Sequence, residues 1–124
     1  MYCGIDIIEV ERIKEAIIKN DKFCKKIFSN KEIKEIELIK SNVKYQRYAG
    51  RFAAKEAIYK AISNIINENN IIFEFNKIEI LNNDIRKPYV VFLDDKLNKV
   101  LQNYKIDISI SHIKDTATAM CIVT

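Results

Sequence analysis

The chain has 124 residues, of which 48% are hydrophobic and 31% charged, with a formal net charge of +4 and a pI near 8.9. This length and apolar content are sufficient for one domain with its own core, and they exclude a disordered or fibrous chain. The small positive charge does not require a nucleic acid, and it favours anionic ligands or an acidic protein partner.

The N-terminal segment and the cysteines both indicate a cytoplasmic protein. Charged residues begin at Asp6, so the start of the chain contains neither a signal-peptide pattern nor an apolar run that could cross a bilayer. Cys3, Cys24 and Cys121 form an odd set without Cys-x-x-Cys spacing, which favours free, buried thiols over disulfides or a zinc site. We therefore expect a cytoplasmic location and no membrane association.

The first part of the chain is predicted to form a strand followed by two helices. An apolar, β-branched run predicts a buried strand over Tyr2–Ile8, and helical spacing of apolar residues follows over Glu9–Asn20. Ser29 and Glu32 have the spacing of a capping box, which predicts a second helix that ends near Ser41.

The longest predicted helix runs from about Tyr45 to Ile66, a segment without proline and with one glycine, Gly50. Small residues recur along it every four positions and would let another backbone approach closely. These residues are Ala49, Ala53, Ala57 and Ala61. We expect this segment to be the central helix of the fold.

The rest of the chain predicts a hairpin with Pro88 at a strand start, a short helix, and two final strands joined by a polar turn. The segments are Ile78–Ile80 and Tyr89–Leu93 for the hairpin, Asp94–Tyr104 for the helix, and Ile106–Ser111 and Thr116–Val123 for the strands. No repeat or linker interrupts them. The predicted fold class is α+β, with residues 1–124 forming one domain in which a small antiparallel sheet packs on a long central helix with shorter helices.

Asp6 is the first candidate functional residue, because a carboxylate within a buried strand is costly without a partner or a metal ion. The strand period places Asp6 on the same face as Gly4, which leaves room for a close approach. An ordinary carboxylate at a strand edge or helix cap is the alternative.

The segment RFAAKEAIYKA, residues 51–61, provides the next candidates. Phe52, Glu56 and Lys60 are four residues apart and share one face of the long helix. An exposed ion pair between Glu56 and Lys60 is the alternative. The small residues on either side favour a site in which a carboxylate meets a metal ion against a sheet.

His112 is the only histidine and ends a predicted strand within DISISHIKDTATA, residues 107–119. Ligands often bind at such positions, although a lone histidine in a turn is also commonly structural. No second histidine or cysteine stands at zinc-ligand spacing, and no glycine-rich phosphate loop or nucleophile elbow is present. Two carboxylates without soft ligands favour Mg²⁺ and phosphoryl-type transfer.

Three segments together resemble one enzyme family. GIDIIEVERI at 4–13, RFAAKEAIYKA at 51–61 and SISHIKDTATA at 109–119 are similar, in this order and separation, to the conserved blocks of the holo-acyl-carrier-protein synthases, and KPYVVF at 87–92 is similar to the family's hairpin segment. The resemblance implies transfer of the 4′-phosphopantetheine group from coenzyme A to a serine of apo acyl carrier protein, with release of adenosine 3′,5′-bisphosphate. It also implies a short phosphopantetheinyl transferase that supports fatty acid biosynthesis and forms a homotrimer with active sites between subunits.

The same resemblance implies roles for individual residues. Asp6 and Glu56 would bind Mg²⁺, Glu56 would take the serine proton directly or through water, and Lys60 would neutralise or protonate the leaving phosphate. The expected contacts to the coenzyme A phosphates are Arg51, Lys55, Lys60, His112 and Lys114. The acidic carrier protein would dock on basic residues of the first helix, for which a solvated helix face is the alternative. These residues are Arg12, Lys14 and Lys19.

The chain departs from the family pattern in two places. Residues 63–72 read SNIINENNII, without the glycine that the family commonly has near the coenzyme, and Ile113 replaces a small hydroxyl residue after the histidine. Asparagine can adopt the positive φ of such a glycine. Two other functions stay open from the residues alone, namely a non-catalytic module that binds acidic protein or RNA and an enzyme that hydrolyses coenzyme A at its pyrophosphate.

Overall fold

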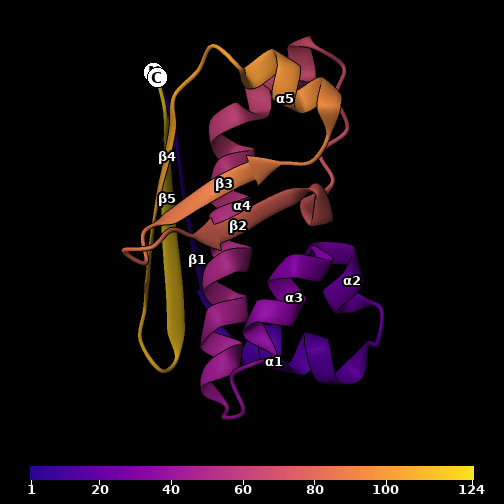
Figure 1. Ribbon diagram of the computed structural model, residues 1–124, viewed down its shortest axis with the longest axis vertical. Coiled ribbons are helices and arrows are strands. Elements are labelled where there is room, and N and C mark those ends of the chain that lie inside the picture. The colour runs from indigo at the N-terminus through magenta and orange to yellow at the C-terminus, as the bar shows by residue number, and fades with distance from the viewer.

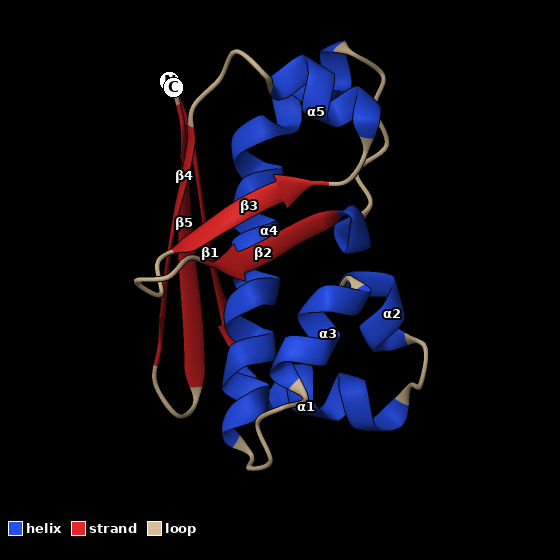
Figure 2. Cartoon of the chain, in the orientation of Figure 1, coloured by secondary structure: helices blue, strands red, loops and turns tan.

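A long central helix organises the computed structural model, which describes residues 1–124. Helix α4 (Val43–Glu68) lies between a three-stranded sheet on one side and α1, α2 and α3 on the other, and a two-stranded hairpin crosses the helix (Figures 1 and 2). The other elements are β1 (Tyr2–Glu9), α1 (Val10–Lys19), α2 (Phe23–Ile27), α3 (Asn30–Ile36), the 3-10 helix η1 (Phe75–Lys77), β2 (Ile78–Asn82), β3 (Pro88–Phe92), α5 (Asp95–Leu101), β4 (Ile106–His112) and β5 (Thr116–Val123). No helix combines the length and the apolar character needed to cross a membrane.

The predicted fold class is confirmed, and the structure adds three details. The antiparallel strands form two separate sheets, one ordered β1-β5-β4 and the other the hairpin β2-β3. Helix α2 was not predicted, because five residues are too few to show a helical period. Helix α3 ends at Ile36, well before the predicted end near Ser41. The Glu37 side chain after it accepts a hydrogen bond of 2.7 Å from the Tyr48 hydroxyl, which ties the end of α3 to α4.

Strand β1 packs directly against the backbone of α4. A Cβ atom built on Gly4 would overlap the carbonyl oxygen of Ala57 and would lie 2.9 Å from the amide nitrogen of Ala61. The predicted role of the alanine stripe is therefore confirmed for these two residues, since only small groups fit on both sides of the contact. The strand period turns Cys3 to the opposite, exposed face, so the prediction of three buried thiols is confirmed for Cys121, wrong for Cys3 and only partly met by the half-buried Cys24.

Helix α4 contributes to two hydrophobic clusters on its different sides. The larger one, of 16 buried residues, joins α4 to the sheet, the hairpin and α5, with Ile58 and Ile62 fully buried. The smaller one, of seven buried residues, lies beneath α1, α2 and α3, where the rings of Phe28 and Tyr48 are 4.9 Å apart. A helix that is apolar on several sides is typical of the centre of a domain.

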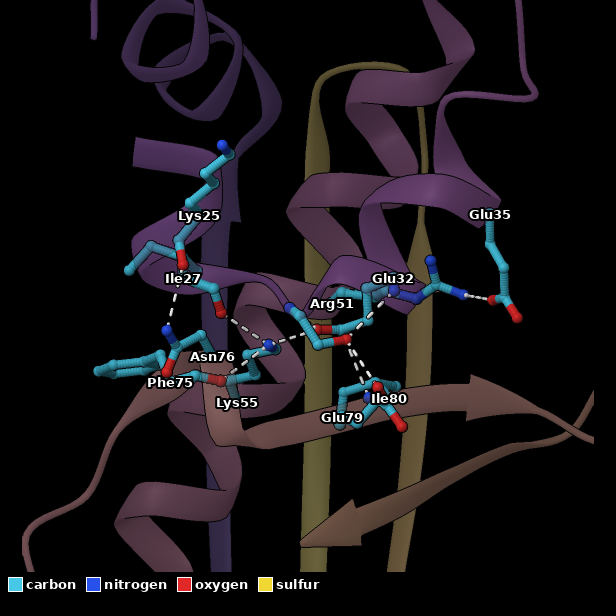
Figure 3. A network of polar contacts seen from close by, with 11 residues as sticks. Lys25, Ile27, Glu32, Glu35, Arg51, Lys55, Phe75, Asn76, Glu79 and Ile80 are labelled. Atoms are coloured by element: carbon cyan, nitrogen blue, oxygen red, sulfur yellow. Dashed lines mark hydrogen bonds and ion pairs between the residues drawn. The ribbon is translucent and has the colours of Figure 1, made fainter. Parts of the chain in front are cut away.

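A buried ion pair fastens α3 and the hairpin to α4 (Figure 3). The Lys55 ammonium donates hydrogen bonds to Glu32 Oε1 at 2.6 Å, to the Ile27 carbonyl at 2.7 Å and to the Phe75 carbonyl at 2.9 Å. Both side chains of the pair are 0% exposed. Burial lowers the pKa of Lys55 to about 8, while the charge of Glu32 opposes this change.

Glu32 completes the network with its second oxygen. Glu32 Oε2 accepts a hydrogen bond of 3.1 Å from the Ile80 amide in β2. The predicted capping box is confirmed, since the Ser29 hydroxyl and the Glu32 carboxylate each accept from the other residue's backbone amide. The Ser29 hydroxyl also donates to Glu79 Oε2 at 2.8 Å. Glu32 therefore links α3, α4 and β2.

Removing one member of the buried pair should be costly, because the other charge stays buried without its partner. Glu32→Gln is expected to lower the free energy of unfolding by about 3–5 kcal/mol in urea denaturation followed by circular dichroism. The double variant Glu32→Leu/Lys55→Met should be less destabilised than Glu32→Gln alone. Glu15→Gln removes the exposed pair with Lys19 and should change stability little. Equal effects of Glu32→Gln and Glu15→Gln would contradict this account of the network.

Candidate functional site

The structure brings Asp6, Glu56 and Lys60 together where β1 lies against α4. Lys60 Nζ is 3.2 Å from Asp6 Oδ1 and donates a hydrogen bond of 2.9 Å to the Ile5 carbonyl oxygen. Glu56 lies one helical turn before Lys60. Burial and then the charge of Asp6 raise the pKa of Glu56, whereas the charge of Lys60 lowers it. The two carboxylates are therefore close enough to repel each other.

The fold holds the Asp6 side chain toward α4. Asp6 lies on the same face of β1 as Gly4, whose contact with α4 brings the strand close to the helix. On the other side, the Thr118 hydroxyl donates a hydrogen bond of 2.8 Å to the Asp6 carbonyl oxygen from the paired strand β5. Asp6 does not cap the following helix, since α1 begins at Val10 and its N-cap position is taken by Glu9, with no side-chain hydrogen bond to the helix.

The donor set of this cluster suits a hard divalent cation. Asp6 and Glu56 provide carboxylate oxygens, and the chain contains no group of three or more histidine, cysteine or acidic residues that could enclose a metal ion. A site with two carboxylates leaves most of an octahedral shell to water or substrate oxygens, as Mg²⁺ prefers. Lys60 pairs with Asp6 rather than Glu56, so the ordinary i,i+4 ion pair considered from the sequence does not form.

A second group of polar residues lines a cavity of about 200 Å³ beside the same helix. Its arginine and histidine members come from α4, from the turn of the hairpin and from the end of β4. They are Arg47, Arg51, Arg86 and His112. The Arg51 guanidinium is 3.2 Å from Glu35 Oε2, whereas neither Arg47 nor Arg86 takes part in an ion pair. Two guanidinium groups without an acidic partner make this cavity suitable for a phosphate.

The hairpin turn positions Arg86 with an uncommon backbone conformation. Arg86 has a φ of 62°, and Asn70 is the only other non-glycine residue with a positive φ. The Asn83 side chain accepts hydrogen bonds from the amides of Ile85 at 3.0 Å and Lys87 at 2.9 Å, and it thereby holds the turn. A positive φ is sterically unfavourable for a residue that has a Cβ atom. Arg86 nevertheless adopts it, and in this conformation of the turn its side chain lines the cavity.

His112 contributes a neutral ring to the cavity. Its Nδ1 forms a hydrogen bond of 3.0 Å with Gln46 Oε1, which fixes the orientation of the imidazole. Burial and then the charge of Arg47 lower the pKa of His112. The ring is therefore mainly uncharged at neutral pH, and it can act as a hydrogen-bond donor or acceptor rather than as a fixed cation.

Two of the predicted phosphate contacts lie elsewhere. Lys55 is completely buried and its ammonium already has three acceptors, so it cannot reach a coenzyme phosphate without breaking the network of Figure 3, and this expectation is corrected. Lys114 does not line the cavity that contains His112. It lines a larger hollow of about 640 Å³ together with Lys14 and Tyr45.

The basic residues of α1 are divided between solvent and the second hollow. Arg12 and Lys19 are exposed, and Lys19 lies 3.9 Å from Glu15. The Lys14 ammonium lies 5.5 Å from the centre of the Tyr45 ring, a cation–π distance. The sequence patterns did not reveal Arg47 or Arg86, because neither belongs to a recognisable motif. The asparagine in the loop after α4 does take the expected positive φ, at Asn70.

Comparisons with known proteins agree on one family. The model of the 4′-phosphopantetheinyl transferase superfamily matches residues 2–121. The chain is 48% identical to a holo-[acyl-carrier-protein] synthase of Fusobacterium nucleatum, over 97% of this chain and 95% of the relative, and 45% identical to one of Clostridium tetani, over 97% and 92%. Its fold is similar to the crystal structure of a holo-(acyl-carrier-protein) synthase from Bacillus anthracis in complex with CoA (3′,5′-ADP), with a TM-score of 0.78, 33% identity, and coverage of 98% of this chain and 94% of that one.

Proposed function

The chain belongs to the holo-[acyl-carrier-protein] synthases of the 4′-phosphopantetheinyl transferase superfamily, and we propose that Asp6, Glu56 and Lys60 form its active site. The enzyme transfers the 4′-phosphopantetheine group of coenzyme A to apo acyl carrier protein. The observation that supports this site is the convergence of two carboxylates and one ammonium at the contact between β1 and α4.

Asp6 and Glu56 are the proposed ligands of Mg²⁺. Both offer hard oxygen donors from rigid elements, and the absence of nearby soft ligands disfavours zinc. The Asp6 side chain retains 16% of its exposure, so water and substrate oxygens can reach it. When bound, Mg²⁺ neutralises the charge of the coenzyme diphosphate and makes the β-phosphorus easier to attack.

The residues around the diphosphate have distinct tasks in the transfer. The serine oxygen of the carrier protein forms a bond to the β-phosphorus as the bond from that phosphorus to the bridging oxygen breaks. Adenosine 3′,5′-bisphosphate leaves with the bridging oxygen. Glu56, whose pKa is raised by burial and by Asp6, is a better proton acceptor than a solvated carboxylate and can take the serine proton directly or through water. Lys60 neutralises or protonates the leaving phosphate.

The basic cavity is the proposed site for phosphate groups of coenzyme A. Arg51 and His112 were expected in this role from the sequence, and Arg47 and Arg86 line the same cavity. Planar guanidinium groups match the oxygens of a phosphate with two parallel hydrogen bonds. Lys60 is the proposed contact to the diphosphate. Lys114 lies in the larger hollow with Lys14 and Tyr45, so it would contact a coenzyme molecule that extends into that hollow.

The carrier protein is proposed to dock on α1. Arg12 and Lys19 are exposed on this helix, and Lys14 lies near its first turn beside Tyr45. These cations complement an acidic helix, and the net charge of +4 helps to attract such a partner over longer distances. We place the reaction in the cytoplasm, in fatty acid biosynthesis. The free state of all three cysteines supports a reducing compartment.

A homotrimer is the proposed assembly. The face of the β1-β5-β4 sheet that points away from α4 carries apolar side chains exposed to solvent. They are Ile5, Ile7 and Met120, which are 64%, 69% and 44% exposed. Exposed apolar patches of this kind are typical of protein interfaces. Packing of this face against neighbouring subunits would cover it and would place β1, which carries Asp6, beside a second subunit.

The modification assay tests the site directly. Purified protein with coenzyme A, Mg²⁺ and apo acyl carrier protein should increase the carrier's mass by one phosphopantetheine group, and a chelator should stop the reaction. Asp6→Asn and Glu56→Gln should each lower kcat/KM at least about 100-fold without lowering the melting temperature, since both carboxylates are partly exposed. Glu74→Gln, at an exposed carboxylate in the loop before β2, should retain full activity.

Full activity in either carboxylate variant would contradict the proposed site. Release of free phosphopantetheine without any carrier protein would instead identify a hydrolase of coenzyme A. Binding of an acidic protein or RNA with no transfer and no metal dependence would favour a non-catalytic module.

Substitutions in the basic cavity should weaken coenzyme binding more than turnover. Arg47→Gln and Arg86→Gly are each expected to raise KM for coenzyme A about tenfold and to change kcat little, because each removes a charged phosphate contact far from the bond that breaks. Glycine is chosen at position 86 because it fits the φ of 62° without strain, so the turn should stay folded. Unchanged KM in both variants would exclude the cavity as a coenzyme site.

The proposed assembly can be measured by sedimentation equilibrium. The unchanged chain should sediment with three times the mass of 14.5 kDa. Ile7→Lys should shift the protein toward the monomer, because it places a charge in the proposed apolar interface. Ile72→Lys, at an exposed apolar residue in the loop after α4, should leave the mass unchanged. A monomer for the unchanged chain would refute the assembly.

A further inference from the structure

The ammonium of Lys60 forms an ion pair with Asp6, one of the two carboxylates that are proposed to bind the metal ion. Lys60 Nζ contacts both Asp6 Oδ1, at 3.2 Å, and the carbonyl oxygen of Ile5, at 2.9 Å. The two acceptors come from adjacent residues of β1, so the ammonium is held against the strand itself. The Lys60 side chain is half exposed, but its ammonium is bound to the strand and is not free in the solvent, as that of a lysine on an exposed helix face commonly is.

The surroundings of Lys60 explain why an ammonium is held at this place. Lys60 follows Glu56 by one turn on the same face of α4, and its ammonium lies 3.2 Å from Asp6 Oδ1 on β1, so it stands beside both carboxylates. No other lysine, arginine or histidine forms an ion pair with either carboxylate. Lys60 is therefore the one cation that offsets the repulsion between them.

The metal ion and the ammonium cannot both keep their best contacts with Asp6. Mg²⁺ binds a carboxylate oxygen at about 2.0–2.1 Å, so it would bring two positive charges to the edge of a side chain that Lys60 already contacts. The repulsion between them favours movement of the more mobile group. The Lys60 side chain is 50% exposed, and its ammonium is at the end of a flexible aliphatic chain. Asp6 is 16% exposed and has a short side chain on a strand.

We propose that Lys60 is the internal counter-ion of the Asp6 and Glu56 carboxylates in the metal-free enzyme, and that a divalent cation must displace it from Asp6. The inference rests on the proposed active site. Displacement leaves the ammonium without its acceptors on β1 and free to contact the phosphate of the coenzyme. Metal binding thus makes the catalytic lysine available, and the lysine in turn weakens the affinity of the empty site for metal.

Direct titration of the metal alone tests this competition without any turnover. Mn²⁺ is added to the full chain in the absence of coenzyme, and unbound Mn²⁺ is measured by electron paramagnetic resonance. Lys60→Met keeps much of the side-chain length and removes the charge, so we expect it to bind Mn²⁺ about tenfold more tightly than the unchanged protein. Lys60→Arg keeps the charge and should bind within about twofold of the unchanged protein.

Thermal unfolding gives a second readout of the same state. Without metal, Lys60→Met leaves the two carboxylates without a counter-ion and should melt at a lower temperature than the unchanged protein. Addition of Mn²⁺ should then raise its melting temperature by more than that of the unchanged protein, because ligand binding stabilises the folded state according to its affinity. A variant that does not fold would be replaced by Lys60→Gln, with the same expectation.

Matched variants separate the possible failures. Lys99→Met removes an exposed lysine of α5 that forms no ion pair, and a gain in affinity as large as that of Lys60→Met would show a general charge effect and overturn the inference. Equal or weaker binding by Lys60→Met, while Asp6→Asn and Glu56→Gln abolish binding, would overturn the counter-ion role but not the metal site. Undiminished binding by both carboxylate variants would instead overturn the proposed site itself.

Discussion

The contact between Gly4 and helix α4 is the constraint on which the site depends. Without a Cβ atom at Gly4, the strand lies directly against the backbone of Ala57 and Ala61. Two residues along β1, about 7 Å away, the side chain of Asp6 points to the same side. Glu56 and Lys60 flank Ala57 on the helix, about one turn apart. The distance between strand and helix thus determines whether two carboxylates and an ammonium meet, and a larger residue at Gly4 would separate them.

The buried pair of Glu32 and Lys55 serves the other side of α4. It holds the start of α3 and strand β2 at fixed places along the helix, and both of its side chains are fully buried. Strand β2 leads into the turn that carries Arg86, while Arg51 lies one turn before Lys55 on α4. The same helix therefore carries the carboxylate cluster on one face and lines the basic cavity with another. The ion pair between Glu32 and Lys55 holds the hairpin at a fixed position relative to this helix.

The distribution of charge is consistent with an enzyme whose two substrates are anionic. Arg47 and Arg86 have no acidic partners, and the exposed cations of α1 face solvent. The carboxylates of Asp6 and Glu56, in contrast, lie close to each other, and the positive charge of Lys60 partly balances their negative charge. An unpaired guanidinium in a cavity is stabilised when a phosphate binds, whereas grouped carboxylates are stabilised when a cation binds. Both arrangements lower the free energy of the complex relative to the free enzyme.

The sequence by itself determined the features that depend on neighbours along the chain. The strand period placed Asp6 beside Gly4, the spacing of four placed Glu56 and Lys60 on one helix face, and the capping box of Ser29 was visible from its residues. Only the tertiary structure decided that Lys60 pairs with Asp6, that Lys55 is buried, and which arginines line the cavity with His112. These contacts join residues far apart in the chain, such as Glu32 and Lys55, 23 positions apart, or Asp6 and Lys60, 54 positions apart. Local periodicity carries no information about such pairs, because their distance is set by how whole elements pack.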